Sequence, residues 1–402
     1  MRIGIDLRSL EDGAQHRGIG RYATELIETL SGLDHDNEYV FLLSKPSAVK
    51  PKLTLNKKFT CSYVYGSGWS LRSVKYVRIM FLLPKPLAVD RFGLDVVLQI
   101  DTSQRIKARR TPVVSVIYDL IPFIYKDLYQ HVHRGGYTPG HLIGYSRMKL
   151  RWKALERQIQ DYKNHARVIS ISEHSKRDLV KWVPRLKSEN VVAIPLAAGQ
   201  LPAVPTKIPE RLNKLGLKNF LFYVGGADPR KGLAEFVGAL EELWSKDPET
   251  QVVIAGKDIV APDLQDAIKL RKVINNLSRA DQVITPGYMS DGELAWLYAH
   301  ARAFVFPSRY EGFGLPILEA MQAGCPVVTY DNSSISEVAG EAALLVPDGE
   351  SMVPALHKVM SDESLRQDLI KKGKARAKQF NWEKTAKETL TVLMQSAKDK
   401  RS

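Results

Sequence analysis

The stretch SRYEGFGLPILEAMQAGCPVV, residues 308–328, places two acids, Glu311 and Glu319, on either side of a Gly-Phe-Gly turn. It follows the apolar run AFVFP and leads into ILEAMQAG, whose spacing predicts a helix with Pro316 in its first turn and Gly324 at its end. We expect Glu319 in the first turn of this helix and Glu311 in the loop before it. A helix N-terminus attracts anions, and an acid would repel them, so we expect both glutamates to accept hydrogen bonds from hydroxyl groups, which sugars and riboses supply. For Glu319 alone, an acid that complements the helix dipole is an equally good interpretation.

A second stretch, FYVGGADPRKGLAEFVGAL, reads as a strand, a turn at Gly225 and Gly226, and a helix. Arg230 and Lys231 are expected where the helix begins. Cations are unfavourable at an end that is already positive, unless an anion binds there. A diphosphate would satisfy both side chains; the alternative is a solvated surface pair.

The stretch QHRGIGRYATELIETL again places glycines, Gly18 and Gly20, at the start of a predicted helix, followed by Arg21 and Tyr22. It lacks the third glycine and the downstream acid of the dinucleotide-binding fingerprint. We expect this loop to line a cleft.

SVIYDLIPFIY ends a predicted strand with Tyr118 and Asp119 at its carboxyl edge. Asp119 is placed for an active-site role, and it could equally cap the next turn. The nine histidines form no cluster with metal-ligand spacing, and no nucleophile-elbow pattern is present.

Near-continuous apolar runs alternate with helical stretches along the whole chain, which predicts parallel sheets covered on both faces. A segment rich in proline, glycine and lysine interrupts the alternation. We therefore predict an α/β fold of two doubly wound, Rossmann-like domains facing a central cleft: residues 1–198, a linker at 199–217, and residues 218–379. Ligands in such sheets bind beyond the carboxyl ends of the strands.

The 402 residues carry 58 Lys and Arg against 44 Asp and Glu, a net charge of +14 with a pI near 9.5. This balance favours an acidic partner, such as anionic lipid, nucleic acid or a phosphorylated substrate. Two cysteines, Cys61 and Cys325, exclude a disulfide framework and a cysteine-based zinc site. The chain opens on a predicted strand without signal-peptide character, and no apolar run is long enough to span a bilayer. We expect a cytoplasmic protein, peripheral at the inner face of the cell membrane.

Two basic stretches favour that membrane contact. WSLRSVKYVRIMFLLPKPLAV interleaves Arg72, Lys75 and Arg78 with apolar residues, and YSRMKLRWKALERQI is similar. A basic amphipathic helix can lie on an anionic membrane. The alternative is an ordinary helix that packs on the core with a solvated charged face.

By these motifs, the chain resembles the family 4 glycosyltransferases over nearly its whole length. The members of this family are retaining enzymes of the GT-B fold. The resemblance rests on GIGRYATEL, YDLIPF, ISEHSKRDL, YVGGADPRKG, EGFGLPILEAMQAGCPVV and SSISEVAGEAALLVPDG, in the order typical of the family. EGFGLPILE matches the family's Glu-x7-Glu motif. The tail, residues 380–402, looks like the terminal helix that crosses back to the first domain in this fold.

The resemblance implies site roles. Glu311 would contact the hydroxyls of the donor sugar, Glu319 would hold the ribose, and Arg230 and Lys231 would hold the diphosphate, with Asp119 as a fourth catalytic candidate. The remaining donor-side candidates are Gly225, Gly226, Gly312, Phe313, Gly314 and Leu315, and the acceptor-side candidates are Gly18, Gly20, Arg21, Tyr22 and Tyr118. Two departures matter: many members have an arginine where this chain has Gly226, and many have a histidine where it has Tyr118.

The implied reaction moves a sugar, mannose or rhamnose by the motifs, from a nucleotide-diphosphate sugar to a hydroxyl of a glycan or lipid-linked acceptor in surface polysaccharide assembly. Two cationic side chains would take the place of a metal, and no cofactor is implied. The alternatives are a nucleotide-sugar epimerase or hydrolase on the same fold, which acts without an acceptor, and a basic nucleic-acid-binding protein. The last would need aromatic and basic platforms that the sequence does not contain.

Overall fold

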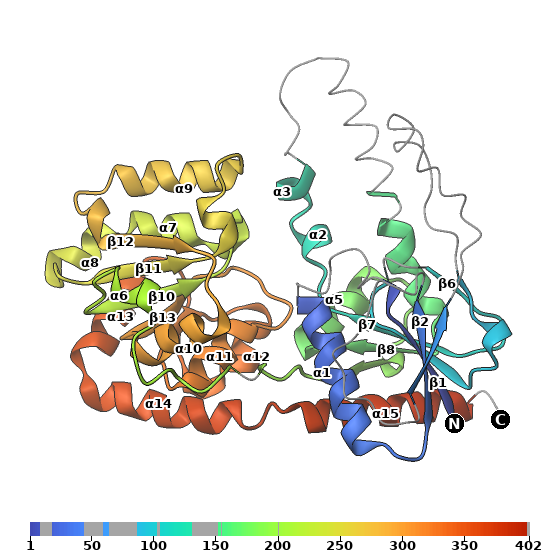
Figure 1. The fold of residues 1–402 in the computed structure, drawn as a ribbon. Helices are drawn as coiled ribbons and strands as arrows, with labels where there is room; N and C mark the ends of the chain where they lie inside the picture. Colours follow the sequence, from blue (N-terminus) through green and yellow to red (C-terminus); the bar gives the residue numbers. More distant parts are fainter. Residues whose placement is uncertain are drawn as a thin grey trace, which may run out of the picture. The chain divides into compact units, whose positions relative to one another are not determined.

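The computed structural model describes residues 1–8, 18–43, 59–63, 87–102, 105–130, 152–153, 155–199 and 201–399. They form two units: Met1–Leu120, Tyr129–Leu196 and Trp382–Ser402 make the first, and Ile121–Leu128 and Ala197–Asn381 make the second (Figure 1). The predicted membrane contact at Arg72, Lys75 and Arg78 lies outside the described residues.

The first unit is built on a parallel sheet of seven strands in the order β3-β2-β1-β5-β7-β8-β9. Its strands are β1 (Arg2–Asp6), β2 (Glu38–Leu43), β3 (Phe59–Tyr63), β5 (Val96–Gln99), β7 (Val113–Ile117), β8 (Arg167–Ser170) and β9 (Val191–Ala193). Nearly all of β1, β2, β5 and β7 is buried, as a sheet covered on both faces requires. A separate ribbon pairs β4 (Leu87–Ala88) with β6 (Ile106–Lys107).

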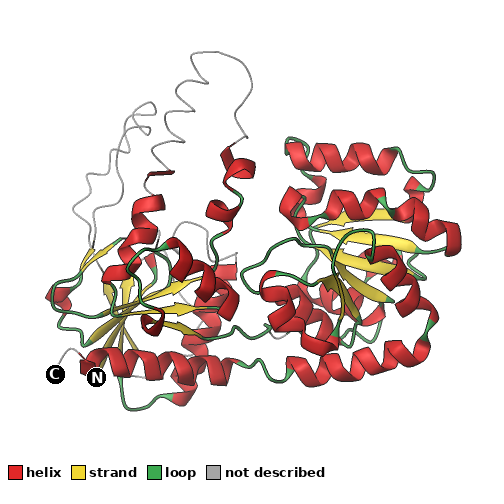
Figure 2. Ribbon diagram, turned by 180° about the vertical axis from the view of Figure 1, so that it is seen from behind, coloured by secondary structure: helices red, strands yellow, loops and turns green. Residues whose placement is uncertain are grey.

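Helices cover the first sheet, as Figure 2 shows from behind. The main ones are α1 (Gly18–Leu33), α5 (Glu173–Trp182) and α15 (Trp382–Asp399), with short 3-10 turns η3 (Asp90–Phe92), η5 (Tyr162–Asn164) and η6 (Ser188–Asn190). The chain's last helix, α15, packs on α1 and against β5, β7 and β8. The first unit therefore combines the two ends of the chain.

The second unit has a parallel sheet of six strands in the order β12-β11-β10-β13-β14-β15. The strands are β10 (Phe220–Val224), β11 (Gln251–Ala255), β12 (Val283–Gly287), β13 (Ala303–Phe306), β14 (Val327–Tyr330) and β15 (Leu344–Val346). An aromatic group of Phe222, Phe304 and Tyr298, with ring centroids 5.0 to 5.9 Å apart, forms part of the core.

The second unit's helices are α6 (Glu210–Asn213), α7 (Leu233–Gly238), α8 (Leu240–Lys246), α9 (Gln265–Asn275), α10 (Asp291–His300), α11 (Leu315–Ala323), α12 (Ser333–Ala339), α13 (Met352–Ser361) and α14 (Glu363–Ala377), and its 3-10 turns are η7 (Pro229–Lys231), η8 (Lys257–Val260), η9 (Ala280–Gln282) and η10 (Gly340–Ala342). Two short helices, α2 (Ile121–Ile124) and α3 (Lys126–Gln130), follow β7. Local signals fix the ends: Ser290 and Glu293 form a capping box at the start of α10, and Gly324 ends α11 at φ 77°.

Every strand of the two large sheets coincides with a predicted apolar run, and the predicted doubly wound α/β class is confirmed. The segment predicted as a linker, 199–217, groups with the second unit and contains α6, and residues 121–128 also group with that unit. The two-residue strands of the β4–β6 ribbon are too short to leave a periodic pattern in the sequence. Of the helices that the structure describes, none is both long and apolar enough to cross a membrane.

Candidate functional site

The second sheet reverses its strand order between β10 and β13. These strands are hydrogen-bonded neighbours, although β11 and β12 come between them along the chain. Ligands of open α/β sheets bind at such reversals, beyond the carboxyl ends of the strands. The loops that leave β10 and β13 carry Arg230, Lys231 and Glu311, so the topology itself brings these residues together.

A short turn in the loop after β10 fixes its two cations. The Asp228 carboxylate accepts a hydrogen bond from the Arg230 backbone N–H at 2.9 Å and so caps η7. Gly232 follows in the left-handed region, at φ 63°, and a Cβ on it would lie 2.1 Å from the carbonyl oxygen of Pro307. Since only glycine fits there, the β10 loop can pack directly on the residue that follows β13.

The prediction that Arg230 and Lys231 stand at a helix start is corrected by this turn. They belong to η7, and α7 begins only at Leu233, after the left-handed Gly232 has changed the direction of the chain. The alternative of a solvated surface pair is also wrong, because the side chains of Arg230 and Lys231 are 9% and 18% exposed.

Serine hydroxyls hold the loop after β13. Ser308 donates from its hydroxyl to Glu311 Oε1 at 2.6 Å. The Glu311 backbone is held at both ends, because its N–H donates to Ser333 Oγ at 3.1 Å and its carbonyl accepts from Ser334 Oγ at 2.8 Å. Both of these serines belong to α12, so a helix that follows the next strand positions the acid.

The Glu311 carboxylate is the anion that the two cations bind. Lys231 Nζ lies 2.5 Å from Glu311 Oε1, and an Arg230 guanidinium nitrogen lies 3.1 Å from the same oxygen. Arg230 also donates to the carbonyl oxygen of Tyr310, and the Lys231 ammonium lies 5.4 Å from the centre of the Phe306 ring. Asp228 Oδ1 also lies 4.0 Å from Arg230 Nε, so two carboxylates balance the two cations of this cluster.

Burial alone would raise the pKa of Glu311, but Lys231 and Arg230 outweigh it and hold the pKa below its ordinary value. The side chain is therefore a carboxylate at neutral pH. Within the described part of the chain, the donors to this carboxylate, from Lys231, Arg230 and Ser308, all reach Oε1. Its second oxygen, Oε2, is therefore available to accept a hydrogen bond from a ligand hydroxyl.

Glu319 does not lie in the first turn of α11, contrary to the prediction. The helix begins at Leu315 after Gly314, whose φ is 108°, so Glu319 is the fifth helical residue and faces the interior at 8% exposure. Tyr298 donates from its hydroxyl to Glu319 Oε2 at 3.2 Å. Interactions of a side-chain charge with the helix dipole are confined to the first turn. Glu319 lies beyond that turn, so the interpretation that it complements the dipole of α11 is wrong.

The other donor-side candidates are mainly backbone positions. Gly312 and Gly314 lie in the loop before α11, and Leu315 is the first residue of that helix, whose first N–H groups have no partner inside the helix. Phe313 is 3% exposed and meets Phe380 edge-on at 5.8 Å, so its side chain belongs to the core.

Gly225 and Gly226 form the turn directly after β10. The Tyr223 hydroxyl donates to the Gly226 carbonyl oxygen at 2.8 Å, and a Cβ on Gly225 would lie 2.6 Å from that hydroxyl. The neighbouring Gly256 would place a Cβ 1.9 Å from the Gly225 carbonyl oxygen. Glycines thus let the loops after β10 and β11 approach each other closely.

Sequence reasoning missed Tyr125, which groups with the second unit. Its ring meets that of Tyr310 at 6.1 Å, and its hydroxyl lies in the field of Arg230, Arg309, Asp228 and Glu311. Burial raises its pKa, and Arg230 partly offsets this. The only signal in the sequence is its place in the YDLIPFIY motif.

The acceptor-side candidates lie in the first unit. Gly18 and Gly20 stand at the start of a helix, as predicted, and Arg21 and Tyr22 follow them in the first turns of α1. Tyr22 is 2% exposed and packs on Trp382 at 5.9 Å.

Tyr118 meets Tyr22 edge-on at 5.7 Å, and among the described residues the buried Tyr118 hydroxyl has no hydrogen-bond partner. Burial raises the pKa of both phenols far above neutral pH. Both hydroxyls are thus held inside the unit as neutral groups. Asp119 follows Tyr118 at the carboxyl edge of β7 and is half-buried.

Sequence reasoning also missed a buried pair at the carboxyl end of β1. Arg8 donates to both carboxylate oxygens of Asp6, at 2.8 and 2.7 Å, and the two residues are 6% and 2% exposed. Planar, two-point contacts of this kind are among the stronger hydrogen bonds in proteins. This pair fixes the chain where it leaves β1, an inner strand of the first sheet.

Comparisons with known proteins agree with this geometry. Residues 205–376 match the family model "Glycosyl transferases group 1". Over 255 residues the chain is 30% identical to O-antigen chain mannosyltransferase B of Escherichia coli, which covers 61% of this chain and 65% of that protein. The chain therefore spans less than two thirds of this relative, and it spans 34% of a serotype-specific mannosyltransferase from the same organism.

Solved structures with the same fold cover almost the whole chain. Sucrose-phosphate synthase from Thermosynechococcus elongatus aligns with a TM-score of 0.66 at 19% identity over 98% of both chains. Anabaena HepE in complex with UDP-glucose aligns with a TM-score of 0.66 at 16% identity over 98% of this chain and 100% of that one. The chain shares the GT-B fold of these structures, and residues 205–376 are similar to the glycosyl transferases group 1 family.

Proposed function

We propose that this protein is a retaining glycosyltransferase that moves a sugar from a nucleotide-diphosphate donor to a hydroxyl of a glycan or lipid-linked acceptor. The observation that carries the proposal is the buried cluster of Glu311, Lys231 and Arg230 at the strand-order reversal of the second sheet. One carboxylate oxygen is held by cations while the other is open to a hydroxyl. Such a site suits a ligand that carries both hydroxyl groups and a diphosphate.

In the proposed reaction, negative charge develops on the departing diphosphate. Lys231 and Arg230 would stabilise this charge from fixed positions, since their loop is capped by Asp228 and packed on Pro307. Donors that are already oriented avoid reorganisation during the reaction and can supply several kcal/mol. Glu311 would orient the sugar through its hydroxyls, and a leaving phosphate oxygen would take the acceptor proton on the same face, which keeps the anomeric configuration.

Mannose is the donor sugar that the relatives favour. The curated relative with 30% identity is a mannosyltransferase of O-antigen chains, and HepE was crystallised with UDP-glucose. We therefore propose a nucleotide-activated hexose, mannose first, as the donor, and surface polysaccharide assembly as the role.

The test is a screen of nucleotide sugars for thermal stabilisation, followed by a transfer assay with the best donor. A ligand at 100 times its Kd stabilises the folded state by about 2.7 kcal/mol, so the matching donor should raise the Tm by several degrees. Glu311→Gln should bind the nucleotide diphosphate and fail to transfer the sugar. Turnover of the donor without any acceptor would favour the epimerase or hydrolase alternative instead.

We further propose that the protein works at an anionic membrane surface on the cytoplasmic side, where a lipid-linked acceptor would be presented. This rests on the +14 charge and on the basic sequence around Arg72, Lys75 and Arg78. Each cation near such a surface contributes about 1 kcal/mol. Co-sedimentation with phosphatidylglycerol vesicles should therefore occur at low salt, fade at high salt, and decrease when the three residues are changed to glutamate. A protein that stays in the supernatant under all these conditions would point to a soluble acceptor.

A further inference from the structure

The first unit contains a pocket at the edge of its sheet opposite to the carboxyl ends of the strands. It has a volume of about 550 Å³ and lies against Val113 and Arg167, the residues that begin β7 and β8. Ser396 and Asp399 of α15 close one side. A pocket of this size is within the range that holds small ligands. Because catalytic ligands of α/β sheets bind at the carboxyl edge, this pocket is not part of the site described above.

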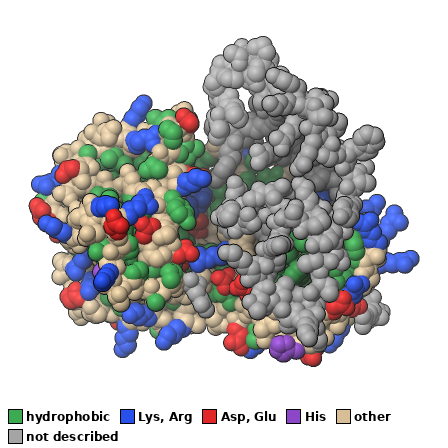
Figure 3. All heavy atoms as spheres, in the orientation of Figure 1, with side chains coloured by type: hydrophobic (Ala, Val, Ile, Leu, Met, Phe, Trp, Pro, Cys, Tyr) green, Lys and Arg blue, Asp and Glu red, His purple; other side chains and the backbone are tan. Residues whose placement is uncertain are grey.

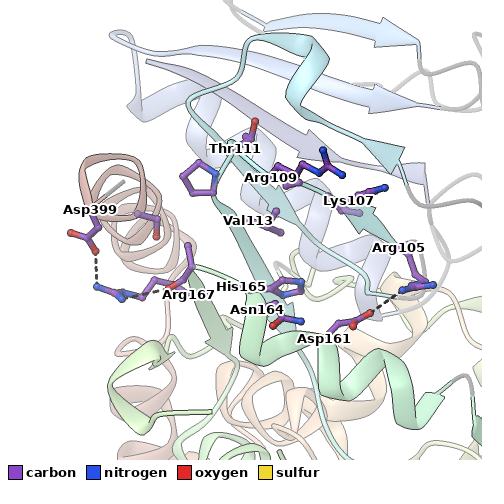
Figure 4. Close-up of a pocket in the computed structure, with 15 residues that line it drawn as sticks. Arg105, Lys107, Arg109, Thr111, Val113, Asp161, Asn164, His165, Arg167 and Asp399 are labelled. Carbon is purple, nitrogen blue, oxygen red and sulfur yellow. Dashed lines mark hydrogen bonds and ion pairs between the residues drawn. The ribbon is translucent and has the colours of Figure 1, made fainter. Parts of the chain in front are cut away.

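Cations dominate the lining of the pocket. Arg105, Lys107, Arg109 and Arg167 face two carboxylates, Asp161 and Asp399. Figure 4 shows the Arg105–Asp161 pair on one side and the Arg167–Asp399 pair on the other, with His165 and Asn164 between them. The pairs are 3.5 and 2.9 Å long and partly exposed, and exposed pairs contribute little to stability. Their arginines can therefore turn toward an incoming anion at small cost.

The backbone that carries Arg109 is held in place before any ligand binds. The N–H groups of Arg109, Arg110 and Thr111 all donate to the Asp90 carboxylate, at 2.8, 3.0 and 2.8 Å. Partial burial would raise the pKa of Asp90, but these donors hold it down, to about 2. Asp90 therefore stays ionised and anchors the loop under the pocket.

His165 gives the pocket an uncharged floor. Ser115 donates to Gln99 Oε1 at 2.9 Å, so its oxygen is left to accept from His165 Nδ1 at 2.8 Å. Burial lowers the pKa of His165 to about 4, which keeps the ring neutral at neutral pH. With Nδ1 as the donor, Nε2 is an acceptor, the partner that a ligand hydroxyl needs.

A second hollow of about 450 Å³ adjoins the pocket and shares Arg105, Asp161 and Asn164 with it. It adds three cations and one acid, namely Lys153, Arg157, Lys163 and Glu156. Figure 3 shows lysine and arginine side chains standing together along the outer margin of the first unit, on the side of β6. Over the second unit, the same view shows cations interspersed with acids. Part of the protein's positive charge is thus concentrated at this edge.

We propose that the pocket binds a ligand with a phosphate or diphosphate group, at a site separate from the donor site. Arginine guanidinium groups match phosphate oxygens in two-point contacts, and lysine adds a point charge. The phosphate could belong to a free phosphorylated compound or to the head group of a lipid. The experiment below distinguishes these two sources.

The test variant is Lys107→Glu/Arg109→Glu, which reverses two exposed cations of the lining. The control variant, Arg110→Glu/Lys187→Glu, makes the same charge change at exposed cations of the same unit that do not line the pocket. All measurements use the Arg230→Ala/Lys231→Ala/Glu311→Gln background, which removes the donor-side cations together with the buried carboxylate that pairs with them. The result is then independent of the proposed transferase activity. If the charge reversal lowers the Tm by itself, Lys107→Gln/Arg109→Gln replaces it.

Inorganic pyrophosphate is titrated calorimetrically, and co-sedimentation is measured with vesicles of phosphatidylglycerol or of phosphatidylcholine. We expect pyrophosphate to bind the background protein and the control within twofold of each other, and the test variant to bind at least tenfold more weakly. That result supports the proposal with a free phosphorylated ligand. If only phosphatidylglycerol vesicles separate the test variant from the control, the proposal stands with a lipid head group. If neither probe separates the two variants, the proposal is overturned.

Discussion

The protein holds two groups of cations, one at each kind of sheet edge, and they differ in how their charge is balanced. At the carboxyl edge of the second sheet, Lys231 and Arg230 share one buried oxygen of Glu311. At the amino edge of the first sheet, Arg105 and Arg167 each have a carboxylate of their own, and both pairs are partly exposed. Both arrangements need long-range topology, since Lys231 and Glu311 are 80 positions apart along the chain and Arg167 and Asp399 are 232 positions apart.

The difference is informative about function. Buried charges that share one counter-ion are fixed in place and are expensive to disturb. That is what a reacting group requires. Exposed, separate pairs can exchange partners at little cost, which suits reversible binding. We therefore expect substitutions in the Glu311 cluster to affect turnover and stability strongly, and substitutions around the amino-edge pocket to affect mainly binding.

The largest effect is expected for Glu311→Gln, which keeps the shape of the side chain and removes its charge. Transfer activity should fall by about three orders of magnitude, because both the orientation of the sugar and the balance of the two cations change. Initial rates with the matching donor measure this. Glu311→Ala should in addition lose about 3–5 kcal/mol of unfolding free energy, since it leaves two cations buried without their counter-ion. Near-normal turnover in the glutamine variant would reduce the cluster to a structural ion pair.

A somewhat smaller effect is expected for Lys231→Ala. The rate should drop by roughly two to three orders of magnitude, the range for losing one preorganised charge-stabilising donor. Arg230→Ala should weaken donor affinity as well. Calorimetric titration with the nucleotide diphosphate separates affinity from rate. If the double variant binds it as tightly as the parent, the two cations do not hold a diphosphate, and the contrast with the amino-edge pocket disappears.

Gly232→Ala tests whether the loop packing positions the cluster. A Cβ would meet the Pro307 carbonyl oxygen, and φ would stay at 63°, so a loss of at least about 1–3 kcal/mol is expected. Gly238→Ala is the matched control, because it lies in α7 with nothing within 4 Å of the added Cβ and should be neutral or slightly stabilising. Denaturant unfolding compares the two. Equal stabilities would mean that the β10 loop moves freely.

The effects of pH on stability are gradual, and they fall in different windows for the two regions. The pKa of His165 is about 4 in the folded state and near 6.5 when unfolded, so the unfolded chain binds more protons between these values. Stability should therefore fall as pH drops from 6.5 to 4, by at most about 1.4 kcal/mol per pH unit. The pKa of Glu311 is lowered on folding, so its contribution is present above about 4.5 and is lost below it. Unfolding curves should be measured from pH 7 to 3.5 for the parent, His165→Asn and Glu311→Gln. The His165 variant should lose only the pH dependence between 6.5 and 4, and the Glu311 variant only the pH dependence below about 4.5.

Much of the fold could be predicted, because buried parallel strands leave apolar runs, and most strands of the two large sheets do so, although β3 (FTCSY) and β12 (VITPG) are more polar. The chemical types at the site were also visible, in Glu311, Arg230 and Lys231. The contact between Lys231 and Glu311 could not be predicted, because the two residues are 80 positions apart along the chain. They meet only because β10 and β13 are neighbours in the sheet, and no local sequence pattern indicates that strand order. The place of Glu319 was missed because the left-handed Gly314 starts the helix at Leu315. The burial of Tyr22 depends on α15, whose Trp382 is 360 positions away along the chain.

The return of α15 to the first unit has a consequence for biosynthesis. The ribosome makes residues 197–381 before it makes the helix that completes the unit started by Met1. Domains usually fold as units during synthesis, the N-terminal one first. Here the first unit cannot complete its fold until α15 has been made. Until then, the surfaces of α1, β5, β7 and β8 that α15 covers remain exposed to solvent. The second unit, in contrast, has been synthesised completely once the ribosome has reached residue 381. Nascent chains stalled after residue 381 should therefore contain a protease-resistant second unit and a first unit that still binds chaperones.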